Sequence, residues 1–231
     1  MLREGSGRDI LLLHGYLSCK ESFYYQIKFL SKSYKVTAPD ILGFGASSPL
    51  AEAYSVGNYC EWLNLFIKKA NLIRPVIIAH SFGARVALKY LSENPDSCEK
   101  LIITGGAGIV KPRSPQYMRR VTAYRRVKKL FPKFAEKHFG SKEYRTLPPV
   151  MRESYKKIVN EDLKVCAAKI AVPTLLIYGK DDTVTPPNEE GEIFNRLICG
   201  SRLEIIDGGH FCFSENHEAF NKLVSEFLMQ R

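Results

Sequence analysis

The chain alternates short apolar runs with longer segments in which apolar residues recur every three or four positions. The short runs are rich in isoleucine, leucine and valine, which is typical of buried strands, and the longer segments have helical spacing. This alternation predicts strands and helices that follow one another along the chain. The expected strands cover residues 9–13, 34–38, 76–79, 101–104, the run that follows 172, and 203–206. The expected helices cover residues 22–30, 56–70, 82 to about 93, 116–129, 150–166 and 218–229.

Two of these helices carry predictions about individual side chains. In the helix over residues 56–70, Trp62, Leu65, Phe66 and Lys69 lie near one another at helical spacing, so this face is expected to pack on the sheet. Arg85 lies one turn into the helix that begins at residue 82. We interpret it as a solvated or salt-bridged helix residue rather than as a substrate contact.

The sharpest local signal lies where the run over residues 76–79 ends. The sequence Ala79-His80-Ser81-Phe82-Gly83 places a serine between small residues, and helical spacing resumes at once. This pattern predicts a strand, a sharp turn and a helix, with the Ser81 hydroxyl raised beside the first amides of the helix. A simpler interpretation is a serine that caps a helix after a buried strand. The five residues resemble the nucleophile elbow G-x-S-x-G of the α/β-hydrolase family, with Ala79 in place of the first glycine.

The resemblance implies that an acid and then a histidine follow, each just after its own strand. The run after residue 172 ends in Gly179-Lys180-Asp181-Asp182, and the spacing from Gly179 favours Asp182 as the acid, with Asp181 as the alternative. The last strand leads into Gly208-Gly209-His210, so His210 is the expected base. The family resemblance thus implies a catalytic triad of Ser81, Asp182 and His210. It also implies an α/β fold, with a mostly parallel central sheet and helices on both faces.

The beginning of the chain resembles the same family. The run over residues 9–13 leads into His14-Gly15, which is similar to the family's oxyanion loop. The resemblance implies that the backbone N–H groups of Tyr16 and Phe82 form the oxyanion hole, since fixed amides suit a developing negative charge. Because about eight residues precede this run, the two opening strands usual in the family are expected to be shortened or absent.

The remaining polar candidates have plainer explanations. Asp40 opens the glycine-containing segment Asp40-Ile41-Leu42-Gly43-Phe44-Gly45 and is expected to be a structural turn residue. His80, His138 and His217 do not follow a strand in the required order, so we expect them to be structural or surface residues.

Charge divides the chain into two parts. Residues 108–166 hold 16 of the 34 Lys and Arg and 5 of the 24 Asp and Glu, a net charge of +11, whereas the remainder carries −1. This basic segment resembles the helical cap of the family, inserted into a core made of residues 1–107 and 167–231. Arg119, Arg120, Arg125 and Arg126 would suit an anionic substrate, since arginine pairs with carboxylates. The alternative is a solvated helix face.

Composition argues against several other classes. The six cysteines form no C-x-x-C pair and no cluster with metal-ligand spacing, so reduced cysteines and no metal site are expected. The first apolar run is too short for a signal peptide or a membrane span, which favours a soluble, cytoplasmic protein without a membrane partner. No phosphate-binding loop and no nucleic-acid recognition motif is present, so neither a nucleotide cofactor nor a nucleic-acid partner is expected.

The resemblance implies a cofactor-free serine hydrolase that cleaves a small carboxylic ester or thioester through an acyl-enzyme on Ser81. The first alternative is a carbon–carbon bond lyase or hydrolase that acts on an anionic substrate, similar to the capped synthase of menaquinone synthesis. The second is a ligand-binding protein that retains the triad without activity. The sequence identifies no substrate-binding residues and no oligomeric state.

Overall fold

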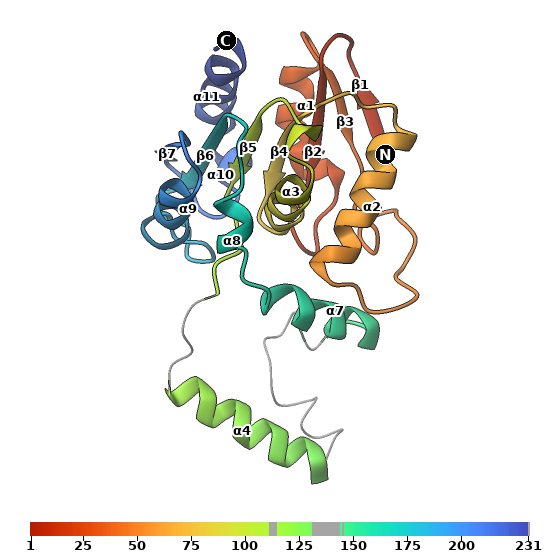
Figure 1. Cartoon of the computed structure of the whole chain (residues 1–231), viewed down its shortest axis with the longest axis vertical. Helices are drawn as coiled ribbons and strands as arrows, with labels where there is room; N and C mark the ends of the chain where they lie inside the picture. The colour runs from red at the N-terminus through yellow and green to blue at the C-terminus, as the bar shows by residue number, and fades with distance from the viewer. Residues whose placement is uncertain (111–114, 131–143, 145, 231) are drawn as a thin grey trace.

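The computed structural model describes residues 1–110, 115–130, 144 and 146–230. A seven-stranded sheet forms its centre, in the order β1-β3-β2-β4-β5-β6-β7 (Figure 1). All neighbouring strands are parallel except β1, which is antiparallel to β3. The strands are Leu2–Glu4 (β1), Asp9–Leu13 (β2), Lys35–Ala38 (β3), Val76–His80 (β4), Leu101–Thr104 (β5), Thr174–Gly179 (β6) and Arg202–Ile206 (β7). The predicted α/β fold with a mostly parallel sheet is confirmed.

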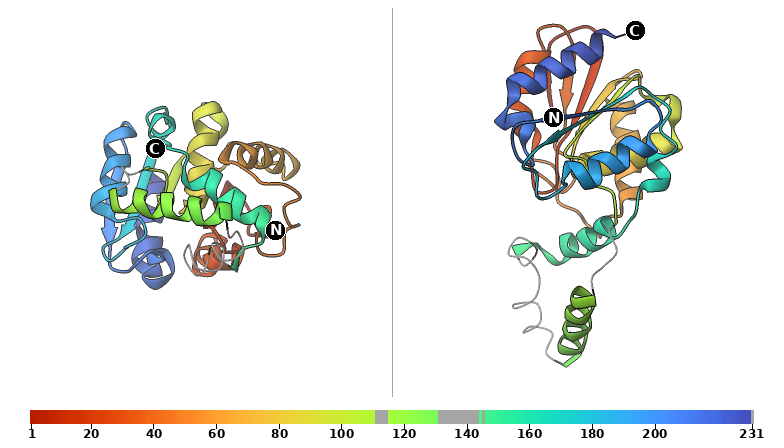
Figure 2. Two further views of the ribbon diagram at one scale, coloured as in Figure 1. Left: turned by 90° about the horizontal axis from the view of Figure 1, so that it is seen from below. Right: turned by 90° about the vertical axis from the view of Figure 1, so that its left-hand side faces the viewer.

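Helices cover both faces of the sheet, as the second view in Figure 2 shows. Successive side chains of a strand point to opposite faces, so Ile77 and Ala79 pack with helices α2 and α3, whereas Val76 and Ile78 pack with α1 and α11. The helices around the sheet are η1 (Lys20–Phe23), α1 (Tyr24–Leu30), α2 (Val56–Lys69), α3 (Phe82–Glu93), η2 (Pro95–Ser97), α8 (Lys164–Ala167), η3 (Pro187–Gly191), α9 (Glu192–Leu197), α10 (Cys212–Glu215) and α11 (His217–Met229).

Helix α2 corrects the prediction about its buried face. Leu65 is 57% exposed, so it does not pack on the sheet, whereas Trp62 and Phe66 are only partly buried and stack on each other. The buried face is instead offset around the helix, and consists of Val56, Tyr59, Cys60, Leu63 and Ile67. These positions are also at helical spacing, so the sequence contains two overlapping apolar stripes, and packing against α3 and the sheet selects this one.

The segment between β5 and β6 contains α4 (Pro115–Leu130) and α7 (Pro149–Val159), which lie beyond one end of the sheet (Figure 1). The single helix predicted over residues 150–166 is wrong, because the chain leaves the helical path at Asn160 and resumes in α8. The amide of Leu163 donates to the carbonyl of Gly108 at 2.9 Å. The amide of Val110 donates to the Asp162 carboxylate at 3.2 Å. The two ends of the basic segment therefore meet.

The amino-terminal strand is short but present. Leu2, Arg3 and Glu4 pair with β3, and the Arg3 guanidinium donates to the carbonyl of Ala70 at 2.6 Å. The expectation of shortened or absent opening strands is thus met by one three-residue strand at the sheet edge. Among the described helices, none combines the length and the apolar character that crossing a lipid bilayer requires.

Candidate active site

The turn between β4 and α3 holds Ser81 in a strained backbone conformation, with φ 50° and ψ −106°. Gly83 makes this turn possible, because a Cβ atom at that position would lie 2.3 Å from the carbonyl oxygen of Leu13. Only a residue without a side chain lets α3 begin this close to the end of β2. The predicted sequence of strand, sharp turn and helix is therefore present, and Ser81 does not cap the helix with its side chain.

Ser81, His210 and Asp182 form a continuous chain of hydrogen bonds. The His210 Nδ1 lies 2.8 Å from Asp182 Oδ2, and its Nε2 lies 3.0 Å from Ser81 Oγ. Because an ionised carboxylate only accepts hydrogen bonds, Nδ1 carries the proton and Nε2 is left to accept from the serine hydroxyl. The three residues follow β4, β7 and β6, whose carboxyl ends meet at one edge of the sheet.

The Asp182 carboxylate is buried and surrounded by donors from its own turn. The amides of Val184 and Thr185 donate to Oδ1 at 2.8 and 2.9 Å, and the Thr185 hydroxyl donates to Oδ2 at 2.8 Å. Burial alone would raise the pKa of Asp182, but the hydrogen bonds from His210 and Thr185 outweigh it and hold the pKa below its usual value. Asp181, the sequence alternative, is exposed and makes no such contact.

The backbone amides of Tyr16 and Phe82 are the predicted oxyanion-hole donors, and both belong to residues near Ser81 in the fold. Neither amide has a hydrogen-bond acceptor among the residues that the structure describes. Tyr16 follows Gly15, where a Cβ atom would lie 3.4 Å from Ser81 Cβ, and Phe82 is the first residue of α3. Two unpartnered amides beside a serine suit a developing negative oxygen.

His14 fixes the loop that contains Tyr16. Its Nε2 accepts from the amide of Ile41 at 2.9 Å, so its Nδ1 carries the proton and donates to the carbonyl of Gly15 at 2.8 Å. Burial lowers the pKa of His14, so the ring remains neutral and keeps this tautomer. The histidine of the His14-Gly15 pair thus anchors the loop and does not face Ser81 directly.

Asp40 lies in the turn that follows β3. Its carboxylate accepts from the backbone amide and the ammonium of Lys20, at 2.8 and 2.7 Å, and from the amide of Ala46 at 3.1 Å. A Cβ atom at Gly45 would lie 2.5 Å from the carboxyl carbon, so the turn closes tightly around this side chain. These contacts agree with the structural role predicted for Asp40.

Arg85 differs from its predicted role. It is 8% exposed, and its Nη1 donates to the backbone carbonyls of Ile158 and Glu161 at 2.9 and 3.0 Å. Those carbonyls lie at and just beyond the end of α7, so Arg85 joins α3 to the basic segment. It is buried rather than solvated, and no described carboxylate forms a salt bridge with it. A buried guanidinium requires acceptors, and these two backbone carbonyls supply them.

The other histidines and the four arginines fall into three groups. His80 is buried directly behind Ser81, and His217 stacks on Tyr25 at a centroid distance of 4.0 Å. Arg119 and Arg126 lie exposed on α4. His138 and the side chains of Arg120 and Arg125 lie outside the described part of the chain.

Aromatic rings extend from the serine turn to α7. Tyr16 contacts Phe82, Phe44 and Tyr155 at centroid distances of 5.6, 4.9 and 5.3 Å. The Tyr16 hydroxyl also donates to the carbonyl of Met151 in α7 at 3.1 Å. The described residues between the serine turn and this part of α7 are therefore mainly aromatic.

Sequence reasoning missed two residues that support this arrangement. The Thr185 hydroxyl contacts both Asp182 and His210, with Nδ1 of the histidine 3.2 Å away. The Glu215 carboxylate accepts from the amide of Gly209 at 2.5 Å and holds the loop before His210. Threonine three residues after the acid was a visible signal, but its importance depends on the turn conformation.

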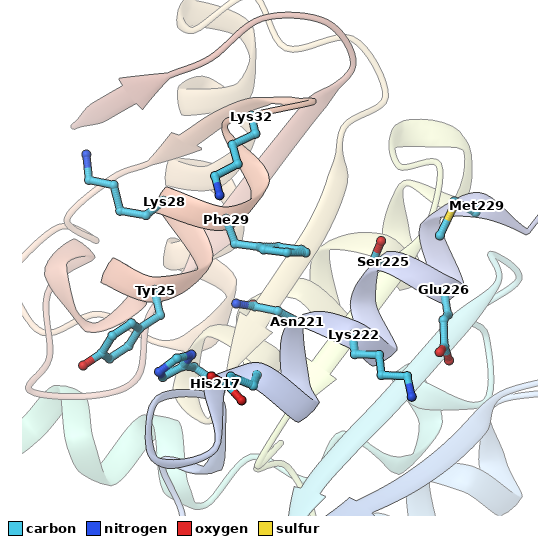
Figure 3. Close-up of a pocket in the computed structure, with 11 residues that line it drawn as sticks. Tyr25, Lys28, Phe29, Lys32, His217, Asn221, Lys222, Ser225, Glu226 and Met229 are labelled. Carbon is cyan, nitrogen blue, oxygen red and sulfur yellow. The ribbon is translucent and has the colours of Figure 1, made fainter.

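The described residues offer no second centre for chemistry. No group of three or more His, Cys, Asp or Glu side chains among them is arranged to hold a metal ion. A groove of about 840 Å³ lies between α1 and α11, lined by Tyr25, Phe29 and Met229 and bordered by Lys32 and Lys222 (Figure 3). It lies on the face opposite α3, away from the Ser81 hydroxyl.

Comparisons with known proteins agree with the fold. The profile of the alpha/beta hydrolase fold family matches residues 10–165. The AB hydrolase superfamily protein YisY of Bacillus subtilis is 25% identical, covering 96% of this chain and 92% of the relative. An esterase from Exiguobacterium antarcticum superposes with a TM-score of 0.80 at 25% identity, covering 99% of this chain and 94% of that one. A bromoperoxidase from Bacillus anthracis superposes with a TM-score of 0.81 at 21% identity, and the match covers 99% of this chain and 94% of the bromoperoxidase.

The family match covers more than half of the chain, and the sheet, the serine turn and the order of the strands agree with it. This chain therefore belongs to the alpha/beta hydrolase fold family.

Proposed function

We propose that this protein is a serine hydrolase that cleaves a small carboxylic ester or thioester through an acyl-enzyme on Ser81. The observation that carries the proposal is the chain of hydrogen bonds from Ser81 Oγ to His210 at 3.0 Å and from His210 to Asp182 at 2.8 Å. A serine hydroxyl is a weak nucleophile unless a base accepts its proton, and a neutral imidazole held by a carboxylate is such a base.

The proposed reaction has two halves. His210 Nε2 takes the hydroxyl proton of Ser81 while Oγ attacks the ester carbonyl, and the amides of Tyr16 and Phe82 bind the resulting oxyanion. When the carbonyl re-forms, the bond to the leaving group breaks and His210 returns the proton to it. Water then attacks the acyl-enzyme in the same way, which releases the carboxylic acid and restores Ser81. Asp182 stabilises the imidazolium that forms in both halves.

The aromatic surroundings support an uncharged acyl group. Tyr16, Phe44, Phe82 and Tyr155 lie between the serine turn and α7, whereas the buried cation nearby, Arg85, is bound to backbone carbonyls. We assign residues 108–166 as a cap and residues 1–107 and 167–231 as the core. The bond between Tyr16 and Met151 supports this division, since it joins the cap to the oxyanion loop.

The similarity to the Exiguobacterium antarcticum esterase supports ester hydrolysis over other activities of the fold. That protein covers nearly the whole of this chain, including the elements that carry Ser81, Asp182 and His210. Fold similarity alone does not select a reaction, so the proposal depends on the geometry of these three side chains.

A fluorophosphonate probe tests the proposal. The parent protein should be labelled, and Ser81→Ala and His210→Ala should not be, because the probe reacts with an activated serine. Ser92→Ala is a matched control, since Ser92 bonds to the carbonyl of Lys89 within α3 and lies outside the site. The parent and Ser92→Ala should likewise hydrolyse short p-nitrophenyl esters, and Ser81→Ala and His210→Ala should not. A well-folded parent that is neither labelled nor active on any ester would contradict the proposal.

A further inference from the structure

His80 is a buried polar residue in a position that the strand pattern reserves for an apolar one. It is the last residue of β4, directly before Ser81, and it is 1% exposed. Val76 and Ile78, which share its face of the strand, are buried in the apolar cluster that contains Phe213. A leucine or phenylalanine would suit this position better, so the imidazole needs another explanation.

One ring nitrogen of His80 makes a specific contact. Nε2 lies 3.0 Å from the backbone carbonyl of His210. Because a carbonyl only accepts, Nε2 carries the proton and donates. The ring also packs against the rings of His210, Phe211 and Phe213, at centroid distances of 4.7, 5.0 and 4.8 Å. His80 therefore connects the strand that carries Ser81 to the loop that carries the proposed base.

The other ring nitrogen has no partner. Nδ1 is buried, and no described residue forms a hydrogen bond with it. A Cβ atom at Gly15 would lie 2.8 Å from this nitrogen, so the oxyanion loop also packs closely on the ring. An unsatisfied buried nitrogen destabilises the folded state, and an apolar residue of similar volume would avoid that penalty.

The ring remains neutral beside the proposed base. Burial lowers the pKa of His80 to about 3, and the neighbouring His210 also disfavours its charged form. An uncharged neighbour does not repel the imidazolium that His210 forms during the proposed reaction.

We propose that His80 is a positioning residue that fixes the main chain and ring of His210 relative to Ser81, at a cost in stability to the fold. The inference rests on the proposed function in one respect, namely that His210 is the base. The N–H on Nε2 and the packed ring hold the loop that contains His210. An imidazole at this position also leaves Nδ1 buried without a described partner, which destabilises the folded state. A residue retained only for packing would be apolar and would not leave a buried nitrogen such as Nδ1 unsatisfied.

Two substitutions separate positioning from packing. His80→Leu fills the space without the donor, and His80→Gln places an amide N–H near the position of Nε2. We expect His80→Leu to lower kcat on a p-nitrophenyl ester by about tenfold to a hundredfold, since small displacements of a catalytic group have effects of this size. KM should change by less than about twofold, because substrate contacts are unaltered. His80→Gln should restore most of kcat.

Stability should change little. The thermal unfolding midpoint of His80→Leu should remain close to that of the parent, because removal of the unsatisfied nitrogen offsets the loss of the donor to the His210 carbonyl. Ile78→Val is a matched control on the same strand and face, and it should lower the midpoint and leave kcat unchanged. A lower midpoint together with an unchanged kcat in His80→Leu would overturn the proposal.

Hydrogen exchange gives a measurement that does not depend on activity. The amides of residues 208–214 should exchange faster in His80→Leu than in the parent, and at the parent rate in His80→Gln. Exchange that is equal in all three proteins would overturn the positioning role. If the parent proves inactive on esters but this exchange pattern is found, the proposed function fails and the restraint on the His210 loop remains.

Discussion

The loops at the carboxyl edge of the sheet and the inserted segment over residues 108–166 are built in different ways. At the sheet edge, main chain lies against main chain, as where Gly83 approaches the carbonyl of Leu13. The insert is attached mainly through side chains, such as Arg85 to the carbonyls of Ile158 and Glu161. The core elements that carry Ser81, Asp182 and His210 therefore depend on close backbone packing, whereas the inserted segment can vary in sequence as long as these few attachments remain.

Charge follows the same division. The insert carries a net charge of +11 and the remaining residues carry −1. The core pairs many of its charges with one another, as Lys20 does with Asp40 and Lys35 with Asp9. On α4, Arg119 and Arg126 are exposed, and no described carboxylate pairs with them. Core charges such as these therefore stabilise turns and strand ends, whereas Arg119 and Arg126 of the insert face outward.

The largest expected effect concerns the acid of the core. Asp182→Asn should lower kcat by about 10⁴-fold, because an amide favours the wrong tautomer of His210. Asp181→Asn is the matched control, since Asp181 is exposed, and its kcat should equal that of the parent. Steady-state kinetics on a p-nitrophenyl ester measure both. Equal losses in the two variants would show that the Asp182 turn does not serve the base.

Thr185 should give a smaller loss within the same turn. Thr185→Val removes the hydroxyl that contacts Asp182 and His210, and leaves the backbone amide in place. We expect kcat to fall by about tenfold to a hundredfold, the value of a hydrogen bond to a charged group. Thr185→Ser restores the hydroxyl and should recover most of the activity. An unaffected Thr185→Val enzyme would mean that the two amides suffice to hold Asp182.

Arg85 tests the junction between the two regions. Arg85→Leu leaves the carbonyls of Ile158 and Glu161 without their buried donor, so we expect a loss of about 1–3 kcal/mol in the free energy of unfolding. Arg196→Leu removes an exposed arginine of α9 and should change stability by less than about 0.5 kcal/mol. Urea unfolding measures both. If the two variants unfold alike, the attachment through Arg85 does not stabilise the insert.

The smallest effect is expected on α4. Replacing Arg119 and Arg126 together with glutamine should change kcat and KM on a neutral ester by less than about twofold, since exposed charges contribute little to a distant uncharged reaction. A large rise in KM confined to anionic substrates would instead favour the carbon–carbon bond alternative. Neutral and anionic esters measured side by side, at two salt concentrations, distinguish these results.

Much of the fold could be predicted because the strands are continuous apolar runs. The strands at Asp9–Leu13 and Leu101–Thr104 agree with their predicted ranges, since both are buried on two faces and end in glycine-containing turns. The buried face of α2 could not be predicted, because two apolar stripes overlap there. The break at Asn160 also escaped prediction, since it depends on contacts with Gly108 and Arg85.

The proposed site was predictable for a different reason. Ser81, Asp182 and His210 each follow a strand, so their order along the chain already implies one shared edge of the sheet. The supporting residues did not follow this rule. Thr185 lies three residues after Asp182, but its contacts with Asp182 and His210 depend on the conformation of the turn. His80 was predicted to be a structural or surface residue, because its contact with the His210 loop is visible only in the fold.

The contact between Leu163 and Gly108 has a further consequence for how such a chain can diversify. The hydrogen bonds from Leu163 to Gly108 and from Val110 to Asp162 bring together the two ends of the long excursion between β5 and β6. The register of the two strands is set by their own parallel pairing. The residues between Gly108 and Leu163 can therefore differ in sequence and length while the core around them stays the same. An insert of another length or charge would therefore leave the positions of Ser81, Asp182 and His210 in the core unchanged.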